Sequence, residues 1–278
     1  VRELSVSAVD AYEAQVSGVI PAAWITEALF TWVCRLVKRR GDPTAPTYLL
    51  GFDSLPIQAE KALYDLAQWC REHPDLASYL QRTPAARLAD QVGRDETPPG
   101  VDGDVWRAWQ ERLGAYLDRY GHSIYDLDFA KPIPAHDPTP SLQTLQVFVR
   151  GQGRDPHERQ QRLLQQRQEA ITAVRERTRG LKRKLFNKTL GWAQTYARLR
   201  EDSIFEIGLG YPALREMVLE VGRRLVDAGA IAQADDVFWL EGDELEACAA
   251  SLDRDQSVND LTARVEERKM RWLSLIHI

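Results

Sequence analysis

The chain has 278 residues, of which 44% are hydrophobic and 28% are charged, and its formal net charge is −5. These values are typical of a soluble globular protein with one large domain or two smaller ones. The slightly acidic balance argues against nucleic acid or an anionic membrane as the main partner.

Residues 7–39 predict a helix that is interrupted near Pro21. Residues 16–37 are the most membrane-like stretch, but Glu27 and Arg35 interrupt them and leave less than the ~20 uncharged residues of a membrane span. We therefore expect a buried helix of a globular domain. After the proline, its apolar face consists of Ile25, Leu29, Trp32, Val33 and Leu36.

The next helix is expected to start at Asp53 or Ser54, with Pro56 in its first turn, and to end near His73. Pro74 starts a short helix, and residues 91–103 predict a loop. Asp104 is expected to cap an aromatic-rich helix that Gly121 terminates. Residues 122–140 hold four prolines, so they predict an extended connection whose proline-rich part is 129–140.

Residues 155–200 are strongly basic and predict a long helix or a helical hairpin bent at Gly180. The simplest interpretation of the basic run is a solvated helix face. The alternative is a surface that meets an acidic domain or a phosphate-bearing ligand. Aromatic residues do not alternate with the basic ones, which gives nucleic-acid binding little support.

The remaining chain predicts a helix that begins at Pro212 and ends at Gly229, a short strand at residues 237–240, and a helix capped by Asp243. We therefore predict a mostly α protein, a multi-helix domain with long, possibly hairpin, helices and at most one or two short strands. Its predicted subregions are residues 1–145 and 146–278.

The motif search predicts no catalytic, cofactor-binding or metal-binding residue. Cys34, Cys70 and Cys248 form no CxxC pair, so we expect buried free thiols in a reducing, cytoplasmic compartment. Gly208 and Gly210 lack the third glycine of a phosphate-binding loop. None of the five histidines has a cysteine or serine partner at motif spacing.

A few polar residues are candidates for contact with a substrate or partner. Tyr120, His122 and Asp126 bring a titratable ring close to carboxylates in a loop. Arg200, Glu201 and Arg215 stand at helix ends, where arginines either tie helices together or hold a phosphate. A turn histidine and structural arginines are the simpler interpretations.

Several segments resemble the central region of phosphoenolpyruvate synthase-like proteins, which include the rifampicin phosphotransferase type. They are Arg198-Leu-Arg-Glu-Asp-Ser-Ile-Phe205, Tyr211-Pro-Ala-Leu-Arg215, Val221-Gly-Arg-Arg-Leu225 and the stretch from Asp235 to Leu245. Tyr116-Leu-Asp-Arg-Tyr-Gly-His122 resembles another stretch of the family, and residues 49–80 fit more loosely. Ser123, Asp126 and Ile133 depart from the residues common in the family, which bears on the substrate.

The resemblance implies a multidomain enzyme with three parts. An ATP-grasp domain that binds ATP and Mg²⁺ precedes the central region, a phosphohistidine domain follows it, and the central region contributes the acceptor-binding surface. This segment is then expected to bind no cofactor and to be inactive alone. Its expected partners are the flanking domains and a small-molecule acceptor, which could be pyruvate, a rifamycin-like drug or another metabolite. We do not expect nucleic acid or a membrane as a partner.

Both ends of the chain are expected to be truncation points. The sequence begins at Val1 and not at an initiator methionine, and residues 274–278 form an uncapped apolar tail. A second hypothesis remains open. The chain could be a non-catalytic helical adaptor or scaffold whose basic helix docks a partner.

Overall fold

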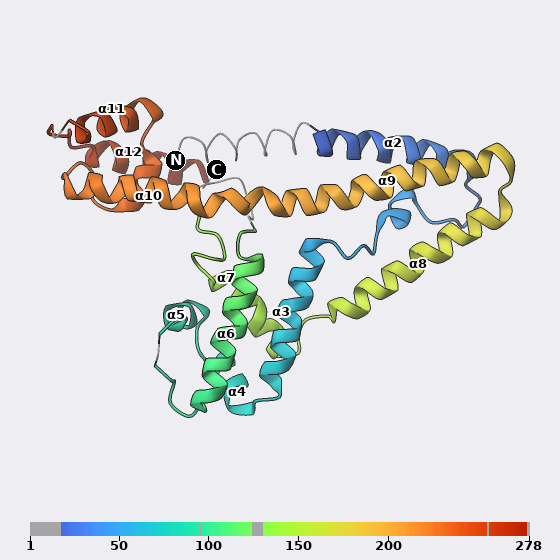
Figure 1. Ribbon diagram of the computed structural model, residues 1–278, viewed down its shortest axis with the longest axis horizontal. Coiled ribbons are helices and arrows are strands. Elements are labelled where there is room, and N and C mark those ends of the chain that lie inside the picture. The colour runs from blue at the N-terminus through green and yellow to red at the C-terminus, as the bar shows by residue number, and fades with distance from the viewer. Residues whose placement is uncertain (1–17, 95, 124–129, 255, 277–278) are drawn as a thin grey trace. The chain divides into compact units, whose positions relative to one another are not determined.

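A computed structural model describes residues 18–94, 96–123, 130–254 and 256–276 (Figure 1). Within these residues the chain forms eleven α-helices and three 3₁₀-helices and no strand. The prediction of a mostly α fold is confirmed.

The chain divides into two compact units. The first contains residues 1–124 and 133–209, and the second contains residues 125–132 and 210–278. Both sides of residue 145 lie in the first unit, so these units differ from the two subregions expected from the sequence.

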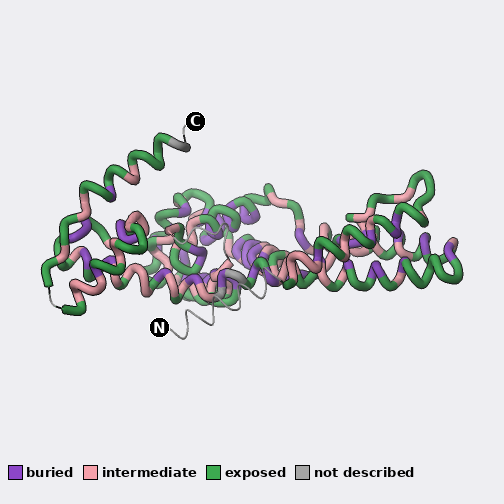
Figure 2. The backbone as a smooth tube through the Cα atoms, turned by 90° about the horizontal axis from the view of Figure 1, so that it is seen from above, coloured by how far each residue is buried: buried purple, intermediate pink, exposed green. Residues whose placement is uncertain are grey.

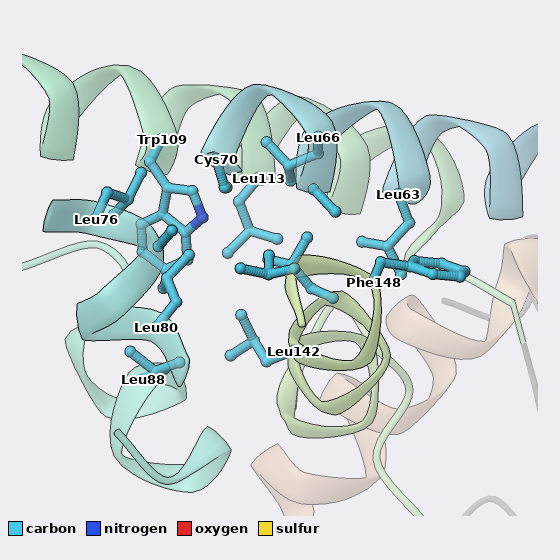
Figure 3. Close-up of a cluster of buried hydrophobic side chains, with 14 of the residues drawn as sticks. Leu63, Leu66, Cys70, Leu76, Leu80, Leu88, Trp109, Leu113, Leu142 and Phe148 are labelled. Atoms are coloured by element: carbon cyan, nitrogen blue, oxygen red, sulfur yellow. The ribbon is translucent and has the colours of Figure 1, made fainter. Parts of the chain in front are cut away.

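Part of the first unit is a five-helix bundle with a leucine- and tryptophan-rich core (Figure 3). Trp106 and Trp109 are fully buried and stacked, with ring centroids 4.6 Å apart. The α6 cap is Asp102 rather than the predicted Asp104, because the Asp102 carboxylate accepts the N–H groups of Asp104 and Val105. The helices are α3 (Leu55–Arg71), α4 (Pro74–Arg82), α5 (Ala85–Gln91), α6 (Gly103–Tyr120) and α7 (Thr139–Val149).

The basic region forms the predicted helical hairpin, α8 (Pro156–Arg177) and α9 (Gly180–Glu206). Gly180 has a φ of +59°, a left-handed conformation that favours glycine, so its predicted place at the bend is confirmed. The short helix η3 (Ile207–Gly210) follows α9.

Helix α2 (Ile20–Val37) packs along α9, and η2 (Ala45–Leu49) completes their core (Figure 1). The rings of Phe30, Tyr48 and Phe186 meet there with centroids 5.6–5.9 Å apart. Three aromatic rings in mutual contact tie the three elements together.

The expectation that α2 is a buried helix is only half right. Its buried side consists of Ala23, Phe30, Val33 and Cys34, whereas Ile25, Leu29, Trp32 and Leu36 are exposed. Among the described helices, α2 alone is long and apolar enough to cross a membrane by length and composition, and 22% of that window is buried. The error arises because α2 carries two apolar faces, and α9 with η2 covers one of them.

The second unit contains α10 (Tyr211–Asp227), η4 (Ala234–Trp239), α11 (Gly242–Leu252) and α12 (Thr262–Ile276). The predicted strand at 237–240 is wrong, because a capping box between Gln233 and Asp236 starts the helical turn η4. Glu241, not the predicted Asp243, caps α11, and its N–H donates to the Glu244 carboxylate. Most of α12 is exposed (Figure 2), but Val265 is buried in the core of this unit, and Arg268 and Lys269 are half-buried.

Candidate functional site

The N-terminus of α3 is stabilised by a carboxylate from α9. The backbone N–H of Leu55 donates to Asp202 Oδ1 at 2.8 Å. Ser54 occupies the N-cap position, as predicted, but its side chain makes no capping hydrogen bond. The Ser54 side chain is fully buried, and Oγ has no hydrogen-bond partner among the described residues.

The C-terminus of α6 packs against the next turn of α9. Tyr120 is buried, and its ring lies 6.2 Å from that of Phe205. The His122 ring meets Phe205 edge-on, with centroids 5.2 Å apart. Two of the predicted candidates, Tyr120 and His122, therefore contact one phenylalanine of α9.

His122 lies in an environment that favours its neutral form. Burial lowers the pKa of the imidazole, and the nearby Glu206 carboxylate raises it by a smaller amount. Nε2 is buried and has no hydrogen-bond partner within the described part of the chain. A neutral ring can donate or accept one hydrogen bond at this nitrogen, depending on its tautomer.

We call the group of Ser54, Leu55, Tyr120, His122, Asp202 and Phe205 the α3–α6–α9 junction. Asp202 and Phe205 are three residues apart on α9, so they stand on the same side of the helix. The junction brings together residues of three segments that resemble the family, 116–122, 198–205 and the more loosely matching 49–80.

Gly121 lets the chain after α6 approach this junction closely. Its carbonyl accepts the N–H of Ala135 at 2.9 Å. A Cβ at Gly121 would lie 2.3 Å from the carbonyl oxygen of Leu117 and 3.0 Å from the nitrogen of Ala135. Backbone, not a movable side chain, fills this space, so a larger residue would displace the 133–135 segment.

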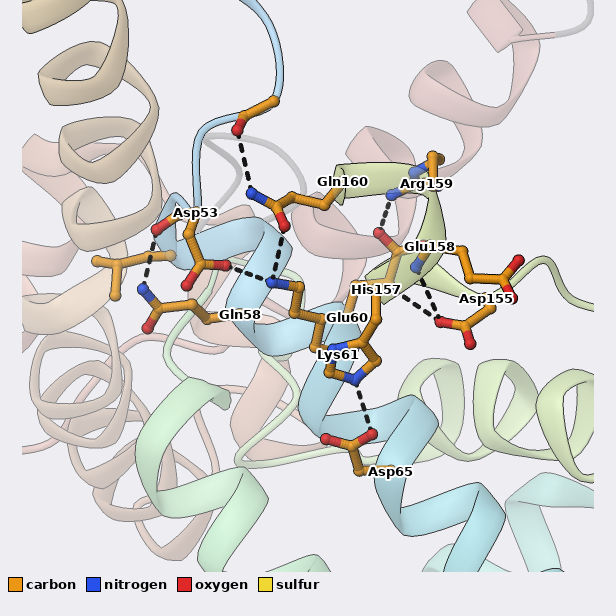
Figure 4. Close-up of polar contacts among 12 residues, drawn as sticks. Asp53, Gln58, Glu60, Lys61, Asp65, Asp155, His157, Glu158, Arg159 and Gln160 are labelled. Carbon is orange, nitrogen blue, oxygen red and sulfur yellow. Dashed lines mark hydrogen bonds and ion pairs between the residues drawn. The ribbon is translucent and has the colours of Figure 1, made fainter. Parts of the chain in front are cut away.

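A polar network that no sequence motif predicted joins α3 to the start of α8 (Figure 4). Lys61 Nζ lies 2.7 Å from Asp53 and 3.5 Å from the Gln160 amide, while Glu60 pairs with Arg159. His157 Nε2 lies 2.8 Å from Asp65. Apart from Lys61–Asp53, these contacts link residues 92 or 99 positions apart, which helix periodicity cannot reveal. We interpret the network as structural.

The other predicted candidates are dispersed. Arg200 lies 3.5 Å from Glu27 and ties α9 to α2. Glu201 lines a small pocket of about 100 Å³ with Arg159 and Leu163. Asp126 falls outside the described residues.

Arg215 is a buried structural residue of the second unit. It donates to the Ala130 carbonyl at 2.8 Å and to Asp235 at 3.0 Å, and its guanidinium lies 4.8 Å from the Phe238 ring centroid. These contacts account for its burial, and they favour the structural interpretation of this arginine over a phosphate contact.

Some basic side chains of α8 and α9 form hydrogen bonds or ion pairs within the protein, and others are exposed to solvent. Arg167 donates to the Leu50 carbonyl and lies over the Phe52 ring, and Arg177 pairs with Asp42. Lys182, Arg183 and Lys184 are exposed. The simple interpretation, a solvated helix face, holds for the start of α9 and for Arg162 of α8.

A second pocket, of about 220 Å³, lies between the end of α2 and the end of α8. Burial raises the pKa of Cys34 to about 12 and that of Tyr48 to about 12, so neither is a nucleophile at neutral pH. The predicted burial of all three cysteines as free thiols is confirmed. The described residues contain no cluster that could hold a metal ion.

The sequence matches the family model described as the rifampicin phosphotransferase fourth domain over residues 12–201. It is 23% identical over 242 residues to the rifampicin phosphotransferase of Streptomyces sviceus, covering 84% of this chain and 26% of that protein. A rifampicin phosphotransferase from a Streptomyces species is 24% identical over 230 residues, which are 80% of this chain and 25% of that protein.

A relative of another kind is chondramide synthase cmdD of Chondromyces crocatus. It is 29% identical over 230 residues, which cover 81% of this chain and 6% of that protein. The chain thus spans about a quarter, or less, of the relatives it matches. The resemblance predicted from the motifs is confirmed, and the chain belongs to the family of rifampicin phosphotransferase fourth domains.

Proposed function

We propose that this chain is the acceptor-side helical domain of an ATP-dependent phosphotransferase. In this proposal ATP and Mg²⁺ bind on another domain, and a phosphohistidine on a third domain carries the phosphoryl group to the acceptor. The observation that carries the proposal is the family match over residues 12–201, which include Ser54, Tyr120 and His122 of the junction.

The chemistry of phosphoryl transfer supports such a division of labour. The reaction depends mainly on positioning the acceptor and on neutralising charge, so an acceptor domain needs no nucleophile of its own. A set of packed helices is suited to that task. In the junction, Asp202 binds the first turn of α3 next to Ser54, and Phe205 packs against His122.

The proposed acceptor is a small molecule with a free hydroxyl group. Two of the matched relatives are rifampicin phosphotransferases, which favours a rifamycin-like acceptor over pyruvate. We assign His122 a positioning role, because its ring packs edge-on against Phe205 in the junction and its buried Nε2 has no hydrogen-bond partner within the described part of the chain. We also expect the protein to act in the cytoplasm.

The test is to incubate the purified chain with MgATP and to measure ATP consumption and acid-labile protein phosphate. Neither is expected. ATP turnover that rises in proportion to the concentration of the purified chain would overturn the proposal, because the ATP site would then lie on this segment.

A binding measurement tests the acceptor side. Calorimetric titration with rifampicin is expected to give saturable binding that His122→Ala weakens and that His157→Ala, a remote exposed histidine, leaves unchanged. Binding of equal strength in both variants would remove His122 from the acceptor site. No rifampicin binding to a folded chain would reject the rifamycin-like acceptor.

The adaptor hypothesis keeps one supporting observation, the exposed lysine and arginine side chains at residues 182–184. It predicts binding to an acidic protein that weakens steeply with salt. The sequence of the gene on both sides separates the two hypotheses, because only the phosphotransferase requires ATP-grasp and phosphohistidine domains there.

A further inference from the structure

Two apolar stripes lie exposed on neighbouring helices. On α2 the stripe is Ile25, Leu29, Trp32 and Leu36, spaced by four, three and four residues. On α9 it is Leu181, Leu185, Trp192 and Leu199, spaced by four, seven and seven. These eight side chains are between 36% and 80% exposed. Such spacing is that of helices that pack against further helices.

On α9 the stripe faces away from the neighbouring elements. Asn187 and Gln194 each stand two residues after a stripe residue, a turn of ~200° around the helix. Asn187 accepts a hydrogen bond from Arg175 of α8, and Gln194 donates to the Tyr48 carbonyl of η2. The stripe therefore lies on the flank opposite α8 and η2.

On α2 the apolar stripe likewise lies on the flank opposite η2. Thr31 stands two residues after Leu29 and lines the pocket that it shares with Tyr48 of η2. The faces of α2 and α9 that meet each other bear Phe30, Val33, Phe186 and Leu190. Since η2 covers one flank of the pair, both stripes lie on the other flank and form one surface, which we call the α2–α9 face.

The α2–α9 face is large enough for a stable association. With side-chain areas of roughly 150–250 Å² each, the eight exposed fractions amount to roughly 800 Å². The largest apolar patch of a typical monomer is about 300–600 Å². A standard protein interface takes about 800 Å² from each partner.

The charges around the face define one orientation for a copy of the same chain. Lys38, Arg39 and Arg40 follow α2 at the hairpin end, beside the basic start of α9 at residues 179–184. The opposite end of α9 carries Arg198 and Arg200 as well as Glu201, Asp202 and Glu206, so its charges nearly cancel. A parallel arrangement would place the two basic ends together, whereas an antiparallel one separates them and places each beside the nearly neutral end of its partner.

We propose that the α2–α9 face binds a second copy of this chain in an antiparallel, two-fold arrangement, with α2 and α9 of both copies forming a four-helix layer. The two-fold axis passes near the middle of both stripes, so Trp32 and Trp192 lie at the centre of the interface. Buried tryptophans near the centre of an interface carry much of its binding energy. This inference does not rest on the proposed function.

The test is sedimentation equilibrium of the whole chain from ~1 to ~100 µM. The wild type is expected to be a dimer, and Trp32→Glu or Trp192→Glu is expected to raise the dissociation constant by ~30-fold or more. Trp24→Glu is the matched control, because Trp24 is 64% exposed on the other flank of α2. It is expected to leave the dimer intact.

Circular dichroism first establishes that each variant folds. A wild type that stays monomeric at ~100 µM would overturn the proposal and leave the face to another domain or partner. So would a dimer that survives both glutamate substitutions. Disulfide cross-linking provides a second measurement, which depends on geometry alone. Leu185→Cys and Leu199→Cys chains are mixed and oxidised, and the yields of the cross-linked dimers are compared. The antiparallel model predicts more 185–199 than 185–185 cross-links, and the reverse result would contradict it.

Discussion

At the scale of single residues, the junction depends on contacts that the sequence alone does not reveal. The sequence before Pro56 predicted a cap for α3 at Asp53 or Ser54, and Ser54 occupies the N-cap position. It could not show that Asp202, 147 residues after Leu55, supplies the acceptor for the first turn. A local cap motif suggests the residue nearest in sequence, whereas the folded chain uses the carboxylate nearest in space.

Asp202→Ala removes that acceptor and is expected to lower the free energy of unfolding by about 1–2 kcal/mol, as the loss of a helix cap does. Urea unfolding measures this. Arg198→Ala is the control, because Arg198 pairs with the other Asp202 oxygen at 3.5 Å and is largely exposed, so a change below about 0.5 kcal/mol is expected. Equal losses in the two variants would mean that the ion pair, not the cap, holds α3.

Glu244 makes the second unit sensitive to acid. The hydrogen bond from Arg268, with others from Glu241 N–H and Arg264, lowers the pKa of Glu244 to about 2 from an ordinary value of 4.5. The ionised carboxylate therefore stabilises the fold fully above pH 4.5, and this contribution is lost as the pH falls from 4.5 towards 2.

We expect hydrogen-exchange protection of α11 and α12, corrected for the intrinsic effect of pH, to fall over that window in the wild type. Glu244→Gln is expected to be less protected at pH 7 and to show a weaker decline with acid. If protection declined with falling pH by the same amount in the wild type and in Glu244→Gln, Glu244 would be excluded as the titrating group.

At the scale of helices and turns, much of the fold followed from periodicity and from glycine and proline. Pro56, Pro74 and Pro212 each fall in the first turn of a helix, and Gly180 forms the bend of the hairpin. Two of the failed predictions show the limits of apolar patterns. A short apolar run at 237–240 fits a strand or a helical turn equally well, and apolar spacing on α2 does not show which of its two faces finds a partner.

Gly51 and Gly180 provide a matched pair of substitutions. Both have positive φ, at +74° and +59°. A Cβ at Gly180 meets no atom within 4 Å, whereas at Gly51 it would lie 2.5 Å from the backbone nitrogen of Leu164.

Gly180→Ala is therefore expected to cost about 1–2 kcal/mol from backbone conformation alone. Gly51→Ala adds a steric overlap with the α8 backbone, for a total of about 2–4 kcal/mol. Urea unfolding of both variants measures the difference. If Gly51→Ala cost no more than Gly180→Ala, the close packing of residue 51 on α8 would be contradicted.

At the scale of the whole molecule, the sequence predicted the family and the helical class better than it predicted the site. Family motifs survive as short local patterns, so segments such as 116–122 and 198–205 could be recognised one by one. Their meeting at one junction is a product of folding. Tyr120 and His122 met Phe205 there, while Arg200 and Arg215 turned out to be bonded to other partners.

The most direct test of the central claim is a chimera in which residues 12–201 replace the matching segment of the Streptomyces sviceus enzyme. The proposal predicts that the chimera forms phosphohistidine from ATP at the rate of the unaltered enzyme, because the parts of the enzyme in which it places the donor domains are unchanged. Its KM for the acceptor is expected to change. A folded chimera that no longer forms phosphohistidine, or that keeps the parent's acceptor KM, would contradict the assignment of this chain to the acceptor side.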